Sequence, residues 1–171
     1  MLESAKILTK TKEISMSSKP SDVRGLYFEE YQVGQRIITA GRTITESDIV
    51  RFAGLSGDFT QIHTDAEYSK GTPFGQRVAH GLLGMGIGSG LAAQTGMMEG
   101  TVLAFREIKN WKFIKPMFIG DTIHAELEVS STKALSRIGG GSVEIMLSII
   151  NQDDETVMKG VWVVLIASKP S

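Results

Sequence analysis

The sequence predicts an α+β domain in which an antiparallel β-sheet wraps around a buried central helix. The run from His80 to about Thr95 is apolar on nearly every side, which is typical of a helix buried in a core. The residues after it alternate apolar and polar side chains, which is typical of half-buried strands. Short connections between these strands favour antiparallel neighbours. Together these observations indicate one sheet curved around one helix.

The length and composition of the chain fit a single globular domain. Of its 171 residues, 42% are hydrophobic and 22% are charged, which is enough to build a core. We expect residues 1–20 to form a flexible N-terminal extension and residues 21–171 to form the domain. The net charge of −1 provides no field that would attract nucleic acid or an anionic membrane. The sequence has no cysteine, which excludes disulfides, thiolate metal sites and a cysteine nucleophile.

No hydrophobic run in the sequence is long enough to span a membrane. The longest strictly apolar stretch is Val161–Ala167, whereas a bilayer requires about 20 residues. The N-terminal residues contain no apolar leader region, and Glu3 and Glu13 are unlike a transit peptide. We therefore expect a cytoplasmic protein that does not bind a membrane.

Local signals predict the elements that precede the buried helix. A strand is expected over Gln35–Ile44. Thr45 followed by Asp48 resembles a capping box, and the apolar spacing behind it predicts a short amphipathic helix over Glu46–Leu55. Asp65–Ser69 predicts one further helical turn.

The buried helix carries an unusual number of glycines, at Gly84, Gly86, Gly88 and Gly90. Each glycine costs about 1 kcal/mol relative to alanine inside a helix. We therefore expect other parts of the chain to come very close to this helix. A phosphate cradle is the weaker interpretation, because no G-x-G-x-x-G motif with a following acid is present.

Four successive strands are expected in the C-terminal half, at Val102–Phe113, Ile123–Ser130, Val143–Ile149 and Val157–Ala167. The turns between them fall at residues 119–121, 139–141 and 152–155. Since connections this short join antiparallel neighbours, the sequence predicts a four-stranded meander in chain order.

The polar residues with the clearest chemical potential lie just before the helix. Asp58 and His63 are five residues apart in a segment rich in glycine and polar residues, and His80 follows at the helix start. A histidine with a pKa near 6.5 can take a proton from water, and a nearby carboxylate can orient that water. An acid/base pair beside a helix N-terminus indicates water chemistry next to a carbonyl group.

Three separated blocks of the sequence carry a family resemblance, and they read ITESDIVRFAGLSGDFTQIHTD, FGQRVAHGLLGMG and FIKPMFIGDTI. In this order, the blocks resemble the MaoC-like dehydratases, the group that contains the (R)-specific enoyl-CoA hydratases. The resemblance covers about Tyr27 to Ala167 and implies the hot-dog fold, in which an antiparallel sheet wraps around a central helix.

The resemblance also implies roles for four residues. The residues that match Asp58 and His63 hold the water that adds to, or leaves from, C3 of an acyl-CoA. The residue that matches Gly81 offers its backbone N–H to the thioester oxygen, and the one that matches Ser89 lines the site. The expected chemistry agrees, because hydration moves negative charge onto the carbonyl oxygen, where a helix N-terminus stabilises it.

Between the acid and the histidine, this sequence departs from the family pattern. Where the family usually has an Asn-Pro pair, this chain has Thr60-Gln61. The spacing from Asp58 to His63 is kept, so the catalytic assignment is kept with it. The loss of proline leaves the segment freer.

Several candidate residues also have simpler interpretations. His63, Asp65 and His80 could be metal ligands, but this spacing is weak evidence and we expect no metal. His80 is expected to be structural and to bond to nearby backbone. Ser89 either lines the site or bonds to the carbonyl four residues before it.

The remaining candidates are isolated polar residues. Arg77 and Lys115 could meet the phosphates of CoA, but single basic residues are mostly solvated. His124 lies in the polar register of a strand and is expected at the surface.

The resemblance therefore implies a lyase of fatty acid metabolism that hydrates trans-2-enoyl-CoA reversibly to (R)-3-hydroxyacyl-CoA. The expected partner is an acyl-CoA substrate, with no metal or redox cofactor, because CoA is part of the substrate. A homodimer or a higher oligomer is expected, since a sheet this small cannot cover both faces and edges. Two alternatives stay open: a hot-dog acyl-CoA thioesterase and a non-catalytic acyl-CoA-binding module.

Overall fold

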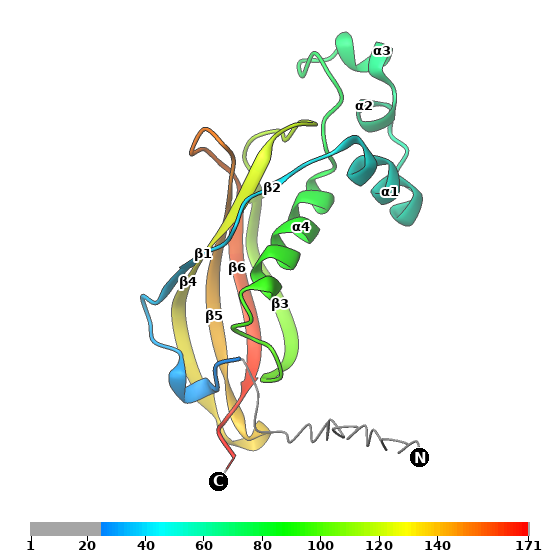
Figure 1. Ribbon diagram of the computed structural model, residues 1–171. Helices are drawn as coiled ribbons and strands as arrows, with labels where there is room; N and C mark the ends of the chain where they lie inside the picture. The colour runs from blue at the N-terminus through cyan, green and yellow to red at the C-terminus, as the bar shows by residue number, and fades with distance from the viewer. Residues whose placement is uncertain (1–24, 171) are drawn as a thin grey trace, which may run out of the picture.

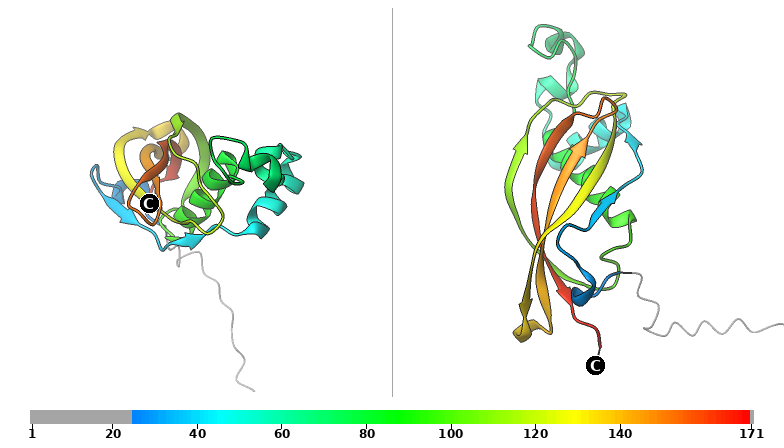
Figure 2. Two further views of the ribbon diagram at one scale, coloured as in Figure 1. Left: turned by 90° about the horizontal axis from the view of Figure 1, so that it is seen from above. Right: turned by 90° about the vertical axis from the view of Figure 1, so that its left-hand side faces the viewer.

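The computed structural model describes residues 25–170, so the extension predicted for residues 1–20 lies outside the described residues. These residues form one strongly curved antiparallel sheet with a long helix, α4, along its concave face (Figure 1). Three short helices gather at one end of the molecule, near the N-terminus of α4. Seen from above, the sheet curves around the helix (Figure 2). The predicted α+β architecture is therefore confirmed.

The first strands are shorter than predicted. A 3-10 turn (Phe28–Glu30) precedes β1 (Arg36–Ile38) and β2 (Arg42–Thr43), which replace the single strand expected over residues 35–44. The break falls at Thr39, whose hydroxyl accepts the N–H of Ala125 at 2.9 Å in place of a backbone carbonyl. Because the acceptor is a side-chain hydroxyl, the ladder of backbone hydrogen bonds is interrupted here, although both short strands still pair with β4.

Helix α1 (Glu46–Ser56) begins as the sequence predicts. The Thr45 hydroxyl accepts the N–H of Asp48 at 3.3 Å, and the Asp48 carboxylate accepts the N–H of Thr45 at 2.9 Å. The capping box is confirmed with aspartate in the place of the usual glutamate. The helix ends at Gly57, whose φ of 77° is a left-handed conformation that favours glycine.

Two single-turn helices follow α1. Helix α3 (Ala66–Lys70) confirms the predicted turn, and Asp65 caps it by accepting the N–H of Tyr68 at 2.9 Å. Helix α2 (Gln61–Thr64) was not predicted, because one turn is too short to show a helical period. Asp58 lies in the connection between α1 and α2, whereas His63 lies in α2.

The central helix α4 (Gly81–Gln94) is buried on one side only. Its sheet-facing side is covered, at Leu83, Gly84, Ile87, Gly88, Leu91 and Ala92. The opposite side is open, and Leu82 is 61% exposed in the described part of the chain. The prediction that the helix is buried all round is therefore wrong for these residues, because the sheet curves around one side of it.

Close packing explains only some of the glycines in α4. A Cβ at Gly88 would lie 2.4 Å from the Cδ1 of Ile149, and one at Gly84 would lie 2.1 Å from the Cε of Met117. At Gly86 and Gly90 nothing lies within 4 Å of the same position. The expected close approach therefore holds for the two sheet-facing glycines and not for the two on the open side.

The large strands are β3 (Val102–Phe113), β4 (Thr122–Leu135), β5 (Gly140–Ile150) and β6 (Thr156–Ala167), with a 3-10 turn (Ser136–Ile138) between β4 and β5. Their alternation is confirmed, since β4 and β5 bury every second residue against α4: Ile123, Ala125, Leu127, Val129, Val143, Ile145, Leu147 and Ile149. These residues form the core of the domain.

The predicted chain-order meander is wrong at one place. The order in the sheet is β1-β4-β5-β6-β3, so β3 pairs with β6 and not with β4. After β3 the chain bonds to the start of β6 through Ile114, and then crosses the end of the sheet, where Gly120 donates its N–H to Ile44. This crossing takes β4 to the far edge, beside β1 and β2. Within residues 25–170, no helix is long and apolar enough to cross a membrane.

Candidate active site

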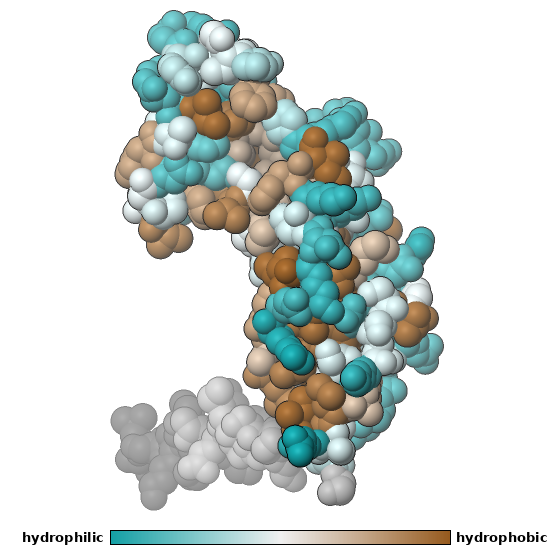
Figure 3. Space-filling view, turned by 180° about the vertical axis from the view of Figure 1, so that it is seen from behind, coloured by the Kyte–Doolittle hydropathy of each residue, from teal (hydrophilic) through white to brown (hydrophobic). Residues whose placement is uncertain are grey.

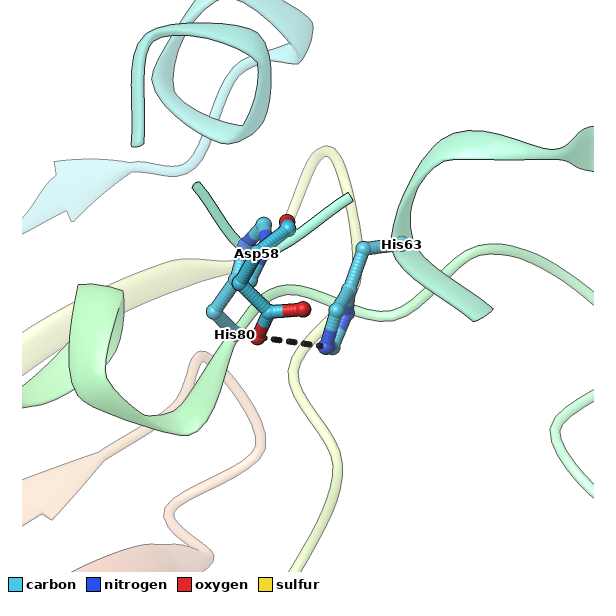
Figure 4. A group of neighbouring side chains, drawn as sticks. All are labelled: Asp58, His63 and His80. Carbon is cyan, nitrogen blue, oxygen red and sulfur yellow. Dashed lines mark hydrogen bonds and ion pairs between the residues drawn. The ribbon is translucent and has the colours of Figure 1, made fainter. Parts of the chain in front are cut away.

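Asp58 and His63 face one another at the end of the molecule that carries α1, α2 and α3. The loop after α1 positions Asp58, and α2 positions His63, with 4.0 Å between the Asp58 Oδ2 and the His63 Nε2 (Figure 4). The Asp58 side chain is 44% exposed, whereas the His63 side chain is largely buried. The separation exceeds a direct hydrogen bond, so both polar atoms can contact the same small reactant.

The hydrogen bonds of His63 fix its reactive nitrogen. The His63 Nδ1 lies 2.8 Å from the carbonyl oxygen of Val78. Since a carbonyl can only accept, Nδ1 carries the proton in this contact. The neutral ring therefore presents the lone pair of Nε2 to Asp58, as a general base requires.

Thr60 keeps the Asp58 carboxylate ionised. The Asp58 Oδ1 accepts the hydroxyl of Thr60 at 2.5 Å and its backbone N–H at 3.1 Å. The hydroxyl bond is the largest influence and the backbone bond the next, and together they lower the pKa of Asp58 below its usual value. The second oxygen, Oδ2, stays available toward His63.

His80 joins the same cluster. Its Nε2 lies 2.9 Å from the backbone carbonyl of Asp58, so the predicted bond to nearby backbone is present. Its ring also stacks on the ring of His63, with 3.8 Å between centroids and 28° between planes. On another side the ring of Phe52 lies 4.9 Å away. The sequence does not reveal the stacking contact.

Gly81 is the first residue of α4 and directly follows His80. The N–H groups of the first helical turn have no acceptor within the helix and attract negative charge. A Cβ at position 81 would lie 2.7 Å from the Cε1 of Phe113, so a larger residue there would require the half-exposed ring of Phe113 to move. A mainly apolar pocket of about 460 Å³ opens next to it, lined by Gly81, Phe113, Lys115 and Met117 among others.

Ser89 does not lie in the cluster formed by Asp58 and His63. It lies eight positions after Gly81 in the helix, which is about 12 Å along the axis. It is exposed, and no hydrogen bond of its hydroxyl is found within residues 25–170, so the alternative in which it bonds to the helix backbone is wrong. It lines a groove with Leu82, Phe105 and Trp162, and Leu82 also lines the pocket at Gly81.

The two basic candidates already have acidic partners. Arg77 forms a bidentate ion pair with Glu46, and this pair raises the pKa of the guanidinium. Lys115 pairs with Glu155 at the edge of the pocket. His124 was expected at the surface, and its side chain is partly exposed and partly covered.

The structure groups a different set of possible metal ligands from the set that the sequence suggests. Asp65 caps α3 and does not belong to the cluster, whereas Asp58, His63 and His80 place one possible ligand atom each within 4.8 Å of one another. A zinc ion requires ligands that converge at about 2.0–2.1 Å in a tetrahedron. The rings of His63 and His80 lie face to face, so their lone pairs lie in nearly parallel planes and converge poorly.

Comparison with known proteins identifies the family of the chain. The family model described as "MaoC like domain" matches residues 29–148. Protein MaoC of Klebsiella aerogenes is 42% identical over 101 residues, which are 59% of this chain and 30% of that protein. An (R)-specific enoyl-CoA hydratase of Rhodospirillum rubrum is 38% identical over 104 residues, which are 61% of this chain and 69% of that enzyme. The chain thus spans less than a third of the first relative.

Solved structures give the same result. A monoamine oxidase regulatory protein from Archaeoglobus superposes with a TM-score of 0.80 and 38% identity, covering 85% of this chain and 97% of that one. An unliganded R-hydratase from Pseudomonas aeruginosa has a TM-score of 0.72 and 28% identity, covering 85% and 88%. A Mycobacterium tuberculosis protein described as a double hotdog fold has a TM-score of 0.70 at 20% identity. The chain therefore belongs to the MaoC-like domain family and has the hot-dog fold.

Proposed function

We propose that the protein is a lyase that hydrates trans-2-enoyl-CoA reversibly to (R)-3-hydroxyacyl-CoA. The observation that carries the proposal is the pair of Asp58 and His63 beside the N-terminus of α4. The family, and relatives named as hydratases and dehydratases, support a lyase role at the family level. The preference for the (R) product rests on these relatives.

The proposed reaction begins with a water held between the two side chains. The Nε2 of His63 takes a proton from this water while Oδ2 of Asp58 orients it, and the oxygen attacks C3 of the enoyl group. Electrons move onto the thioester oxygen, where the N–H of Gly81 and the helix dipole stabilise the charge. A proton then returns to C2, so the elements of water are added across the double bond. The reverse sequence is dehydration.

The apolar spaces beside α4 suit the acyl part of such a substrate. The pocket at Gly81 and the groove at Ser89 share Leu82, and both are lined mainly by apolar side chains. In this proposal, Ser89 lines the path of the acyl chain. In this proposal no metal or redox cofactor takes part. The face-to-face arrangement of His63 and His80 supports the part of the proposal that concerns a metal.

We also propose that two copies of the chain associate. The outer edge of the sheet is β3, and large hydrophobic side chains along it are exposed, at Val102, Leu103, Phe105, Ile108 and Phe113. Seen from behind, the molecule is hollowed below the end that carries α1 to α3 (Figure 3). A second copy paired along β3 would cover this edge. We further propose that the protein is cytoplasmic and that it acts in fatty acid metabolism.

Hydration of crotonyl-CoA tests the proposed activity. We expect the absorbance of the enoyl thioester to fall with the wild-type protein, and Asp58→Asn to reduce the rate by about 100-fold or more. The matched control is Asp65→Asn, because this carboxylate caps α3 outside the site and asparagine caps equally well. An unchanged rate for Asp58→Asn would remove the proposed pair from the mechanism.

A second substrate separates the alternatives. Release of free thiol from butyryl-CoA, without hydration of crotonyl-CoA, would identify a thioesterase. Binding of acyl-CoA without either reaction would identify a non-catalytic binding module.

A further inference from the structure

His80 is a buried residue that contacts both halves of the proposed site. It is 2% exposed, and it stands at the N-cap of α4, immediately before Gly81. Its side chain reaches the backbone of Asp58 and the ring of His63 at the same time. His80 therefore links the start of α4, where the proposed oxyanion-binding N–H of Gly81 lies, with both members of the acid/base pair.

The contact with Asp58 comes from outside its loop. The other hydrogen bonds of residues 58–60 run to partners within residues 56–64 of the same segment. The bond from His80 to the Asp58 carbonyl spans 22 residues of sequence. The loop follows Gly57, where the backbone has the freedom of glycine, so this bond ties the Asp58 backbone to α4.

The contact with His63 fixes the plane of its ring. The hydrogen bond from Nδ1 to the Val78 carbonyl fixes one point, and the ring can still turn about it. The stacked ring of His80, at a centroid distance of 3.8 Å, limits this turning and keeps Nε2 directed at Asp58.

The hydrogen-bonding state of His80 fits a supporting role better than proton transfer. Its Nε2 donates to a carbonyl, so in the neutral ring the Nδ1 has no proton. This Nδ1 is buried and has no hydrogen-bond partner within residues 25–170. Within these residues, Nδ1 therefore has no hydrogen-bonded group with which it could exchange a proton.

We propose that His80 is a positioning residue that holds Asp58 and His63 in register with the N-terminus of α4. This inference rests on the proposed function, because it assigns His80 an effect on the turnover step and not on the binding of the thioester. It extends beyond the structural role expected for a helix-start histidine, which would affect stability alone.

Three substitutions separate the two contacts. His80→Phe keeps an aromatic face for His63 and loses the bond to Asp58, whereas His80→Gln keeps a donor and loses the stacked ring. His80→Ala loses both. We expect kcat for crotonyl-CoA to fall about 100-fold in His80→Ala, with smaller losses in the other two and a KM within about threefold of wild type. His124→Gln is the matched control, since it replaces a histidine on β4 with no contact to the site.

Coupling to Asp58 gives a readout that lost stability alone would not produce. In the Asp58→Asn background, His80→Ala should reduce kcat by less than threefold. A residue that acts only by positioning Asp58 and His63 has a small effect once the Asp58 carboxylate has been removed. Two results would overturn the proposal. One is that His80→Ala reduces kcat by the same factor in the wild-type and Asp58→Asn backgrounds. The other is that it lowers the melting temperature and leaves kcat unchanged.

A spectroscopic measurement keeps this test apart from the test of the proposed function. In protein labelled with ¹³C,¹⁵N-histidine, wild type should show a rigid His63 ring with its proton on Nδ1, and His80→Gln should show increased motion of this ring, because the bond to Val78 alone lets it turn. The three histidines of the sequence are assigned by replacing each in turn. Unchanged motion of the His63 ring in His80→Gln would contradict the positioning role. Failure of wild type to hydrate crotonyl-CoA would refute only the activity.

Discussion

At the scale of single residues, the ionised state of Asp58 depends on Thr60. The Thr60 hydroxyl and N–H both bond to one carboxylate oxygen and lower the pKa of Asp58. A group with a lowered pKa stays ionised above that value and is lost as a carboxylate when the pH falls through it. Thr60 thus supplies contacts where the family usually has asparagine.

Thr60→Val removes the hydroxyl bond without a change of shape, so we predict that the pKa of Asp58 rises. The pKa should stay low in Thr60→Ser, which keeps a hydroxyl. The measurement is the pH dependence of the ¹³C chemical shift of the Asp58 carboxyl carbon, assigned with Asp58→Asn. A pKa of Asp58 that is the same in Thr60→Val and in wild type would show that the bond does not set the ionisation of Asp58.

The sequence predicts the identity of the site residues better than their contacts. Asp58 and His63 are found because their spacing and surroundings form a recognisable block, and the structure places them face to face. The Val78 carbonyl, the stacked His80 and the ring of Phe113 beside Gly81 are tertiary contacts, which a local pattern does not encode. Thr60 two residues after an aspartate was the one available signal, because such pairs often form a local turn.

At the scale of elements, α2 begins at the position where the family usually has proline, and its backbone would accept a proline there. Gln61 is the first residue of α2, a position where proline is favoured because its missing N–H needs no partner. Thr60 has φ −54° and ψ 135°, which suit a residue before proline. Within the described residues, the Gln61 N–H forms no hydrogen bond that proline would remove.

Gln61→Pro should therefore stabilise the protein by about 0.4–1 kcal/mol, since it restricts the unfolded chain without straining the folded one. Urea denaturation measures the change, with Gln61→Ala as the control for the lost side chain. A lower free energy of unfolding in Gln61→Pro than in Gln61→Ala would contradict the backbone argument.

The glycines of α4 should respond differently on its two sides. Gly90→Ala is expected to stabilise the protein by about 1 kcal/mol, because it adds a helix former where nothing lies within 4 Å. Gly88→Ala should destabilise it by about 1–3 kcal/mol, since the new methyl group would displace Ile149 from the core. Thermal unfolding of the two variants checks the contrast, and an equal gain in both would show that the core accommodates the methyl group.

Elements with strong local signals are predicted well. The capping box of α1 and the alternation of β4 and β5 are present as expected. The single turn of α2 and the break at Thr39 are missed, because each depends on one hydrogen-bonded contact and not on a repeated pattern.

At the scale of the whole molecule, strand order is the feature that the sequence predicts wrongly. A short connection between β3 and β4 favours a hairpin, yet residues 114–121 cross the end of the sheet and β3 pairs with β6. Local patterns specify which face of a strand is buried, but they do not specify which edge the next strand joins. The resulting order leaves β3 at the outer edge, beside the open side of α4.

Charge on the β3 edge should separate the proposed dimer into monomers. Leu103 is 51% exposed and lies on this edge, so Leu103→Lys adds a buried charge only if a second copy covers it. We expect wild type to sediment as a dimer or larger and the variant to shift toward monomer, with Lys133→Leu on β4 as a control substitution. A wild-type protein that sediments as a monomer would contradict the proposed association.

The central claim is that Asp58 and His63 add water to C3 of an enoyl thioester. The most direct measurement is NMR of the product formed from crotonyl-CoA in D₂O. The proposed mechanism predicts 3-hydroxybutyryl-CoA with one deuterium at C2, formed about 100-fold or more slowly by Asp58→Asn. Free CoA as the product, or equal rates for wild type and Asp58→Asn, would contradict it.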